Sequence, residues 1–120
     1  MKVYLEEVSS GKIVEALISR ASNKEMPLKK AGWQFNWKQL SKTEGADIFK
    51  LTKLETPKEV EGMLMLTLLN GEMLFMNNLE VAPHNYGSNG TYNNVAGNLL
   101  AFACYKSFEQ GKNYYLGYLS

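Results

Sequence analysis

Residues 84–97 bring together the residue types that can bind a phosphate group without a basic side chain. A loop rich in glycine and asparagine leads into a segment whose apolar residues recur at helical spacing from Val95 onward. The first turn of a helix has backbone N–H groups without intrahelical acceptors, and it carries the positive end of the helix dipole. The pattern therefore predicts an anion site at the start of this helix, of a kind that suits a pyrophosphate.

A plain interpretation of the same residues stays open. Helices often follow glycine-rich loops, and Asn93 or Asn94 can cap such a helix without any ligand. Neither G-x-G-x-x-G nor Gly-Lys-Ser/Thr occurs in the chain, and no Lys or Arg lies between Pro83 and Tyr105. The alternative is therefore a capped loop with no bound anion.

The loop must be positioned by the strands on either side of it. Residues 63–69 and 73–81 are two apolar runs, and Asn70-Gly71 between them is a favoured pair for a two-residue type I′ hairpin. Strands that are apolar on both faces need helices above and below the sheet. The helix from residue 94 ends near Gly111. Further strands are expected at residues 2–8, 47–54 and 113–119.

The first third of the chain gives a weaker pattern. An amphipathic helix is expected over residues 11–23, because five apolar residues recur at the spacing of one helical face: Ile13, Val14, Leu17, Ile18 and Ala21. Glycine and proline interrupt residues 24–45, so we expect this segment to cover the sheet and to be only partly helical.

Composition restricts the class of protein. The 120 residues form one domain, residues 1–120, and 45% of them are hydrophobic, enough for a single core. Thirteen basic and 12 acidic residues give a net charge of +1, which argues against a nucleic acid partner. The single cysteine, Cys104, is expected to be buried and inert, and with a single histidine it argues against disulfides and structural zinc. The longest apolar run, residues 63–69, is too short to cross a membrane. We expect a cytoplasmic protein with no membrane partner.

The run LEVAP at residues 79–83, followed by a polar loop and VAGNLL at residues 95–100, resembles the central motif of the GNAT-type N-acetyltransferases. The resemblance covers roughly residues 47–120. It implies a mixed α+β (α/β) fold of GNAT type, with a central, mostly antiparallel sheet and helices on both faces. The family's last helix and two strands have no counterpart, so the resemblance is to a degenerate or truncated member.

The resemblance also implies a site for acetyl-CoA. In the family, a Gln/Arg-x-x-Gly-x-Gly/Ala loop grips the pyrophosphate, and superposing the Leu-Leu pairs puts Thr91, Asn94 and Ala96 at its three signature positions. Only Ala96 matches, although asparagine tolerates the left-handed backbone that a glycine would adopt. The cofactor-binding residues implied are Leu79 and Val81, whose backbone would bond pantetheine, with Thr91, Asn93, Asn94, Val95, Ala96 and Gly97 in the loop.

Acetyl transfer needs a base for the amine proton and donors for the oxyanion. Glu80 is the carboxylate at the end of the strand and is predicted as the base, with the backbone N–H of Val81 as the oxyanion donor. The alternative for Glu80 is a solvated carboxylate. His84 is a back-up base or a surface loop residue, and Tyr115 is a general acid if its hydroxyl points into the site and a sheet-packing residue otherwise.

Two functions from different classes follow from the resemblance. The first is an acetyl-CoA-dependent N-acyltransferase that acetylates an amine of a small molecule or a protein. The second is a catalytically silent GNAT-like domain that binds CoA or a partner protein. Because residues 114–119 form a hydrophobic terminal strand, a homodimer is also expected.

Overall fold

The structure is a computed structural model that describes residues 1–69, 73–110 and 115–118. The strands are β1 Lys2–Glu7, β2 Ile13–Arg20, β3 Ala46–Lys53, β4 Val60–Leu69, β5 Met73–Val81, β6 Tyr92–Asn93 and β7 Tyr115–Tyr118. The helices are α1 Trp37–Leu40 and α2 Val95–Gln110, and three 3-10 helices, η1 Asn23–Glu25, η2 Lys29–Ala31 and η3 Pro83–Asn85, lie in the connections.

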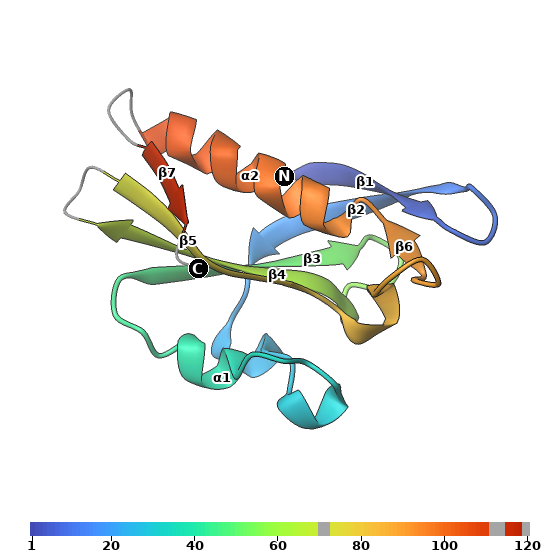
Figure 1. Ribbon diagram of the computed structural model, residues 1–120, viewed down its shortest axis with the longest axis horizontal. Coiled ribbons are helices and arrows are strands. Elements are labelled where there is room, and N and C mark those ends of the chain that lie inside the picture. Colours follow the sequence, from blue (N-terminus) through green and yellow to red (C-terminus); the bar gives the residue numbers. More distant parts are fainter. Residues whose placement is uncertain (70–72, 111–114, 119–120) are drawn as a thin grey trace.

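The strands form one sheet in the order β6-β1-β2-β3-β4-β5-β7. Every neighbouring pair is antiparallel except β5 and β7, which are parallel and are connected through α2. Figure 1 shows α2 on one face of the sheet, the α2 face, and α1 on the other, the α1 face. The fold is therefore mixed α+β, with a mostly antiparallel sheet and helices on both faces, as the sequence predicts.

Each face of the sheet has its own apolar core. On the α2 face, Leu99 and Phe102 of the helix pack against strand residues such as Leu64. On the α1 face, Trp33 and Trp37 pack against Met63. Consecutive strand residues point to opposite faces, which explains why the middle of β4, residues 63–66, is apolar on both faces. Residues 24–45 cover the α1 face and are only partly helical, so this prediction is confirmed.

The helix predicted over residues 11–23 is wrong, because this segment contains β2. Ala16 and Ile18 are buried, whereas Ile13 and Leu17 are exposed, as the alternation of a strand requires. Residues four apart, such as Val14 and Ile18, lie on one face in a helix and also on one face in a strand. Their spacing therefore fits both structures. Pairing with β1 and β3 decides for the strand.

The predicted hairpin is confirmed by the pairing of β4 with β5, which runs from Gly62 opposite Val81 to Leu69 opposite Met73. The Asn70-Gly71 turn itself lies outside the described residues. The register shifts so that no β4 residue lies opposite Asn77, although the Thr67 hydroxyl of β4 donates to the Asn77 side-chain oxygen. Such a bulge bends its strand, and bulges recur beside active sites.

Cys104 is exposed, so the prediction of a buried thiol is wrong; the apolar stripe of α2 runs through Leu99, Phe102 and Ala103, and Cys104 lies just outside it. Within residues 1–69, 73–110 and 115–118, no helix is long and apolar enough to span a bilayer.

Candidate functional site

The carboxylate of Glu80 is buried on the α1 face and is surrounded by donors. Its Oε2 accepts hydrogen bonds from the backbone N–H of Gln34 at 2.6 Å and from the Tyr86 hydroxyl at 3.0 Å. Its Oε1 accepts from Trp37 Nε1 at 2.8 Å and from the backbone N–H of Phe35 at 3.2 Å. An ionised carboxylate offers about four acceptor positions, and the protein fills all four here.

Glu80 therefore holds the segment that covers the α1 face. Trp37 is fully buried, and its indole N–H needs an acceptor at that depth. Asn36 fixes the same segment, because its side chain accepts from the backbone N–H of Gln39 and caps α1. These contacts give Glu80 a positioning role, and its role as a base stays a prediction.

Tyr86 provides a test of this arrangement by pH. Burial first, and then the hydrogen bond to Glu80, raise the pKa of the Tyr86 hydroxyl. A raised pKa in the folded state means that this contribution to stability is complete below the pKa of a free tyrosine and is lost as the pH rises through the folded value. We expect the free energy of unfolding to fall above about pH 10, and Tyr86→Phe to remove that part of the fall. Urea unfolding of the wild-type and Tyr86→Phe proteins from neutral to alkaline pH measures this difference. An equal fall in the free energy of unfolding for the two proteins would contradict the prediction.

The start of α2 has the backbone geometry that the resemblance requires. Asn94, which stands in the place of the motif's first glycine, has φ = 74°, and its carbonyl accepts from the backbone and the side chain of Asn98. The expectation that an asparagine adopts the glycine conformation is confirmed. Within the described part of the chain, the backbone N–H groups of Val95, Ala96 and Gly97 donate to no protein acceptor. Gly97 is exposed.

The structure separates the other predicted loop residues from this helix start. Asn93 belongs to β6, pairs with Glu6 of β1, and donates to its carboxylate. Thr91 donates its backbone N–H to the carbonyl of His84 at 2.8 Å and accepts from Val8 at 3.0 Å. Thr91 and Asn93 thus fasten the loop to the β1 edge of the sheet.

The predicted strand residues also fall into two groups. Leu79 and Val81 are on the same strand as Glu80, β5. Their side chains pack on the α2 face, whereas the Glu80 side chain lies on the α1 face. Tyr115 pairs with Met73 at the start of β5, and its side chain lies outside the described part. Glu80 is seven residues further along β5, about 23 Å at the usual rise of a strand. The structure therefore does not bring Tyr115 and Glu80 together.

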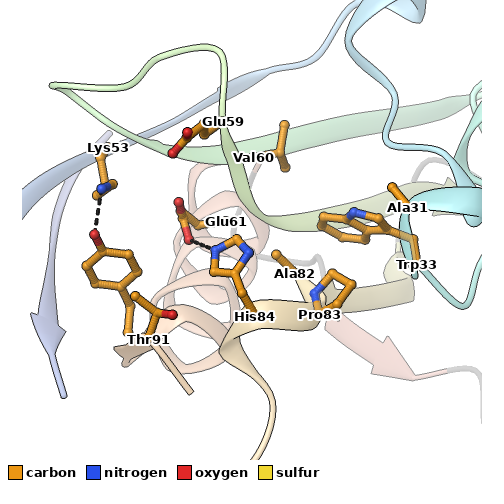
Figure 2. A pocket seen from close by; sticks show the side chains of 11 residues that line it. Ala31, Trp33, Lys53, Glu59, Val60, Glu61, Ala82, Pro83, His84 and Thr91 are labelled. Atoms are coloured by element: carbon orange, nitrogen blue, oxygen red, sulfur yellow. Dashed lines mark hydrogen bonds and ion pairs between the residues drawn. The ribbon is translucent and has the colours of Figure 1, made fainter. Parts of the chain in front are cut away.

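A pocket of about 580 Å³ lies where β3 and β5 end and β4 begins, and sequence reasoning did not find it. Its most buried polar residue is Glu61, 1% exposed, whose Oε1 lies 2.6 Å from His84 Nε2 and accepts from the Asn85 side chain at 3.0 Å. Figure 2 shows the His84 ring in the pocket between Glu61 and Pro83. A glutamate at the start of an apolar strand was the one signal available in the sequence.

A second polar pair lines the same pocket. Lys53 Nζ donates to the Tyr92 hydroxyl at 2.5 Å. That hydrogen bond is the largest cause that raises the pKa of Lys53, and the charges of Glu61 and Glu59 add to it. The ammonium of Lys53 is thus held in its charged form beside the carboxylates.

Comparisons with known proteins identify the fold. No family model and no curated protein matches the sequence. Among solved structures, the chain is similar to a ribosomal-protein-alanine N-acetyltransferase from Brucella melitensis biovar Abortus, with a TM-score of 0.59, 12% identity, and coverage of 87% of this chain and 81% of that one. It is also similar to a GNAT family acetyltransferase from Streptococcus pneumoniae, with a TM-score of 0.54, 17% identity, and coverage of 85% and 74%. The chain has the GNAT fold. A transcriptional regulator from Bacillus halodurans is comparably similar, with a TM-score of 0.57, 12% identity, and coverage of 88% and 81%.

The GNAT fold accounts for the arrangement at the centre of the molecule. The LEVAP run that carries the sequence resemblance covers the end of β5 and the two residues after it, and the VAGNLL run begins α2, which connects β5 to the parallel strand β7. β7 pairs with β5 only from Met73 to Met76, so no described residue of β7 faces β5 beyond the bulge at Asn77. Among the described residues, the side of β5 away from β4 is therefore unpaired from Asn77 to Val81.

Proposed function

We propose that the chain is an acetyl-CoA-dependent N-acyltransferase that moves an acetyl group to an amine. The observation that carries the proposal is the start of α2, where a left-handed Asn94 is followed by three backbone N–H groups without protein acceptors. The GNAT fold supports it, because the solved acetyltransferases named above share this arrangement of elements.

The residues present fit a diphosphate. The N–H groups of Val95, Ala96 and Gly97 would bind its oxygens, and the positive end of the helix dipole would favour its charge. Gly62 of β4 lies directly under this turn, where a Cβ atom would come within 2.7 Å of Val95 and 2.9 Å of Leu99. The absence of a side chain at Gly62 lets the start of α2 sit close to the sheet.

The pantetheine arm would lie along β5. Among the described residues, nothing pairs with Asn77 to Val81 on the side of β5 away from β4, so backbone groups of Leu79 and Val81 could bond the arm as an added strand would. Acetyl-CoA, when bound, supplies the activated acetyl group. The chain itself must orient the acceptor amine, accept its proton and stabilise the developing oxyanion, for which the backbone N–H of Val81 stays the predicted donor.

The second candidate, a GNAT-like domain that binds CoA or a partner protein without turnover, also rests on a specific observation. Thr91 stands at the motif position for Gln or Arg, and its backbone N–H is already used by the carbonyl of His84. The signature side chain that helps to order the loop is therefore lacking. The acceptor, from a small molecule or a protein, and the homodimer stay predictions.

Binding of acetyl-CoA tests the proposal. At a concentration of one hundred times Kd, it should stabilise the fold by about 2.7 kcal/mol in thermal unfolding. Asn94→Gly should keep the binding, because glycine accepts a positive φ. Asn94→Val should lose most of it, because a β-branched residue resists that conformation. Asn89→Val, in the exposed part of the same loop, is the matched control. No stabilisation of the wild-type protein would exclude the transferase and the binding of CoA by a silent domain.

Turnover then separates the two candidates. Release of free CoA thiol in the presence of primary amines supports the transferase. Binding of acetyl-CoA without amine-dependent thiol release supports the silent domain.

A further inference from the structure

The pocket at the ends of β3 and β5 contains the only histidine in the sequence, His84, and this histidine is held by a buried carboxylate. The side chain of Glu61 is 1% exposed, whereas that of His84 is 47% exposed. One end of the imidazole is therefore anchored inside the protein, and its other edge is accessible from the pocket.

The anchoring contact determines which ring nitrogen is available. His84 Nε2 lies 2.6 Å from Glu61 Oε1, and an ionised carboxylate can only accept, so Nε2 carries a proton and donates. In the neutral ring, Nδ1 then has the free lone pair. No hydrogen bond to Nδ1 is formed by any described residue.

Asn85 makes this geometry rigid. Its side-chain N–H₂ donates both to Glu61 Oε1 and to the backbone carbonyl of Glu61, at 3.0 and 3.1 Å, and its own Oδ1 accepts from the backbone of Tyr92 at 3.0 Å. Gly90 packs against the Asn85 backbone so closely that a Cβ atom would come within 2.6 Å of its carbonyl oxygen. The carboxylate and the loop that carries His84 are thus fixed to each other.

Size and charge indicate what the pocket accepts. Its volume of about 580 Å³ lies within the usual range for small-molecule sites, about 300–1,000 Å³. Glu59 and Glu61 contribute two carboxylates, and Lys53, whose ammonium donates to Tyr92, contributes one cation. The excess of negative charge favours a cationic ligand, and Trp33 offers an aromatic wall on the side where Figure 2 shows Pro83.

We propose that this pocket binds the acceptor as a small-molecule primary amine and that His84 is the catalytic base, with Glu61 as its positioning residue. The inference rests on the proposed function and assigns the base to residues outside the motif that carries the resemblance. His84 follows Val81, the predicted oxyanion donor, by three residues.

The proton transfers balance within these groups. The bound ammonium gives one proton to His84 Nδ1, and the neutral nitrogen keeps the lone pair with which it forms the new N–C bond to the acetyl carbon. The imidazolium is stabilised by the charge of Glu61 at Nε2, as the carboxylate of a catalytic triad stabilises its histidine. The C–S bond breaks, and the thiolate leaves with the bonding pair and takes the proton from His84 Nδ1, which regenerates the neutral ring. The second amine proton is lost to solvent.

Nuclear magnetic resonance of the single imidazole tests the site without acetyl-CoA. With ¹⁵N-labelled histidine, we expect a protonated Nε2 and an unprotonated Nδ1 at neutral pH and above. Benzylamine should shift the His84 signals to saturation, whereas benzyl alcohol, which has a similar shape and no charge, should not. A protonated Nδ1, or no response to benzylamine, overturns the proposal.

Kinetics test the role in catalysis. His84→Gln should lower kcat about 100-fold or more, the usual contribution of a general base, and should abolish the acidic limb of the pH profile. Glu61→Gln should lower kcat with little change in KM. Glu55→Gln, the same change at an exposed residue outside the pocket, should have no effect. Because His84 is half exposed, we expect His84→Gln to leave the melting temperature unchanged. That measurement shows that the variant is folded.

The outcomes distinguish this inference from the proposed function. If the wild-type protein and the His84→Gln variant acetylate amines at the same rate, His84 is not the base. The proposed function is then unaffected. A wild-type protein that neither binds acetyl-CoA nor acetylates any amine contradicts the proposed function and with it the catalytic role. In that case the benzylamine titration still decides whether the pocket is an amine site.

Discussion

Glu80→Ala is expected to destabilise the protein by about 3–5 kcal/mol, a loss that places it among the most damaging single substitutions. The alanine removes the acceptor for four donors at once, from Gln34, Phe35, Trp37 and Tyr86. Water can reach some of these donors, but the indole N–H of the fully buried Trp37 would be left without a partner. An unsatisfied buried donor alone costs about 1–3 kcal/mol.

Urea unfolding measures this loss, and two further variants control it. Glu44→Ala removes an exposed carboxylate and should change the free energy of unfolding by less than about 0.5 kcal/mol. Glu80→Gln keeps the shape and one acceptor oxygen, so we expect an intermediate loss. If Glu80→Ala and Glu44→Ala were equally stable, the hydrogen-bond network around Glu80 would not exist in solution.

The same variants decide between two bases. If Glu80 is the base, Glu80→Gln should lower turnover, because an amide cannot accept the amine proton, and should alter the pH profile. A positioning Glu80 predicts that the loss of turnover follows the loss of stability and that the pH profile keeps its shape. The four filled acceptor positions favour the second result, with His84 as the base.

The second half of the fold was predictable because its signals are local. The apolar runs of β4 and β5 and the helical spacing of α2 each lie within about ten to sixteen consecutive residues. The start of α2 was predictable for the same reason, since Asn94 needs only its neighbours to adopt a left-handed backbone. β2 was missed because its two candidate periods share the same apolar positions and only its partners β1 and β3 decide between them.

The pocket could not be predicted because it is made by pairing between distant segments. Glu61 and His84 are 23 residues apart, and Lys53 and Tyr92 are 39 apart. The fold packs the end of β3 and the start of β4 against the segment that carries His84 and Tyr92, and no spacing in the sequence encodes that packing. The separation of Glu80 from Tyr115 follows from the register of the sheet, because Tyr115 of β7 pairs with Met73 at the start of β5, whereas Glu80 lies near the end of β5.

Gly62→Ala is expected to weaken acetyl-CoA binding through a residue that touches no ligand. Its new Cβ would lie 2.7 Å from Val95 Cγ1 and 2.9 Å from Leu99 Cδ1, and both side chains are buried in the core of the α2 face. Overpacking of this kind costs about 1–3 kcal/mol, because α2 must move away from β4 to relieve it. The movement would displace the N–H groups of Val95, Ala96 and Gly97 together.

Gly97→Ala is the matched control for this change in stability. Position 97 is in the same helical turn, its Cβ would have nothing within 4 Å, and its φ is not positive. Alanine should therefore stabilise α2 by up to about 1 kcal/mol. Urea unfolding compares the two variants, and titration with acetyl-CoA compares Gly62→Ala with the wild-type protein. A Gly62→Ala protein with wild-type stability would mean that α2 is not seated against β4, and the anion site would then lose the support that fixes its geometry.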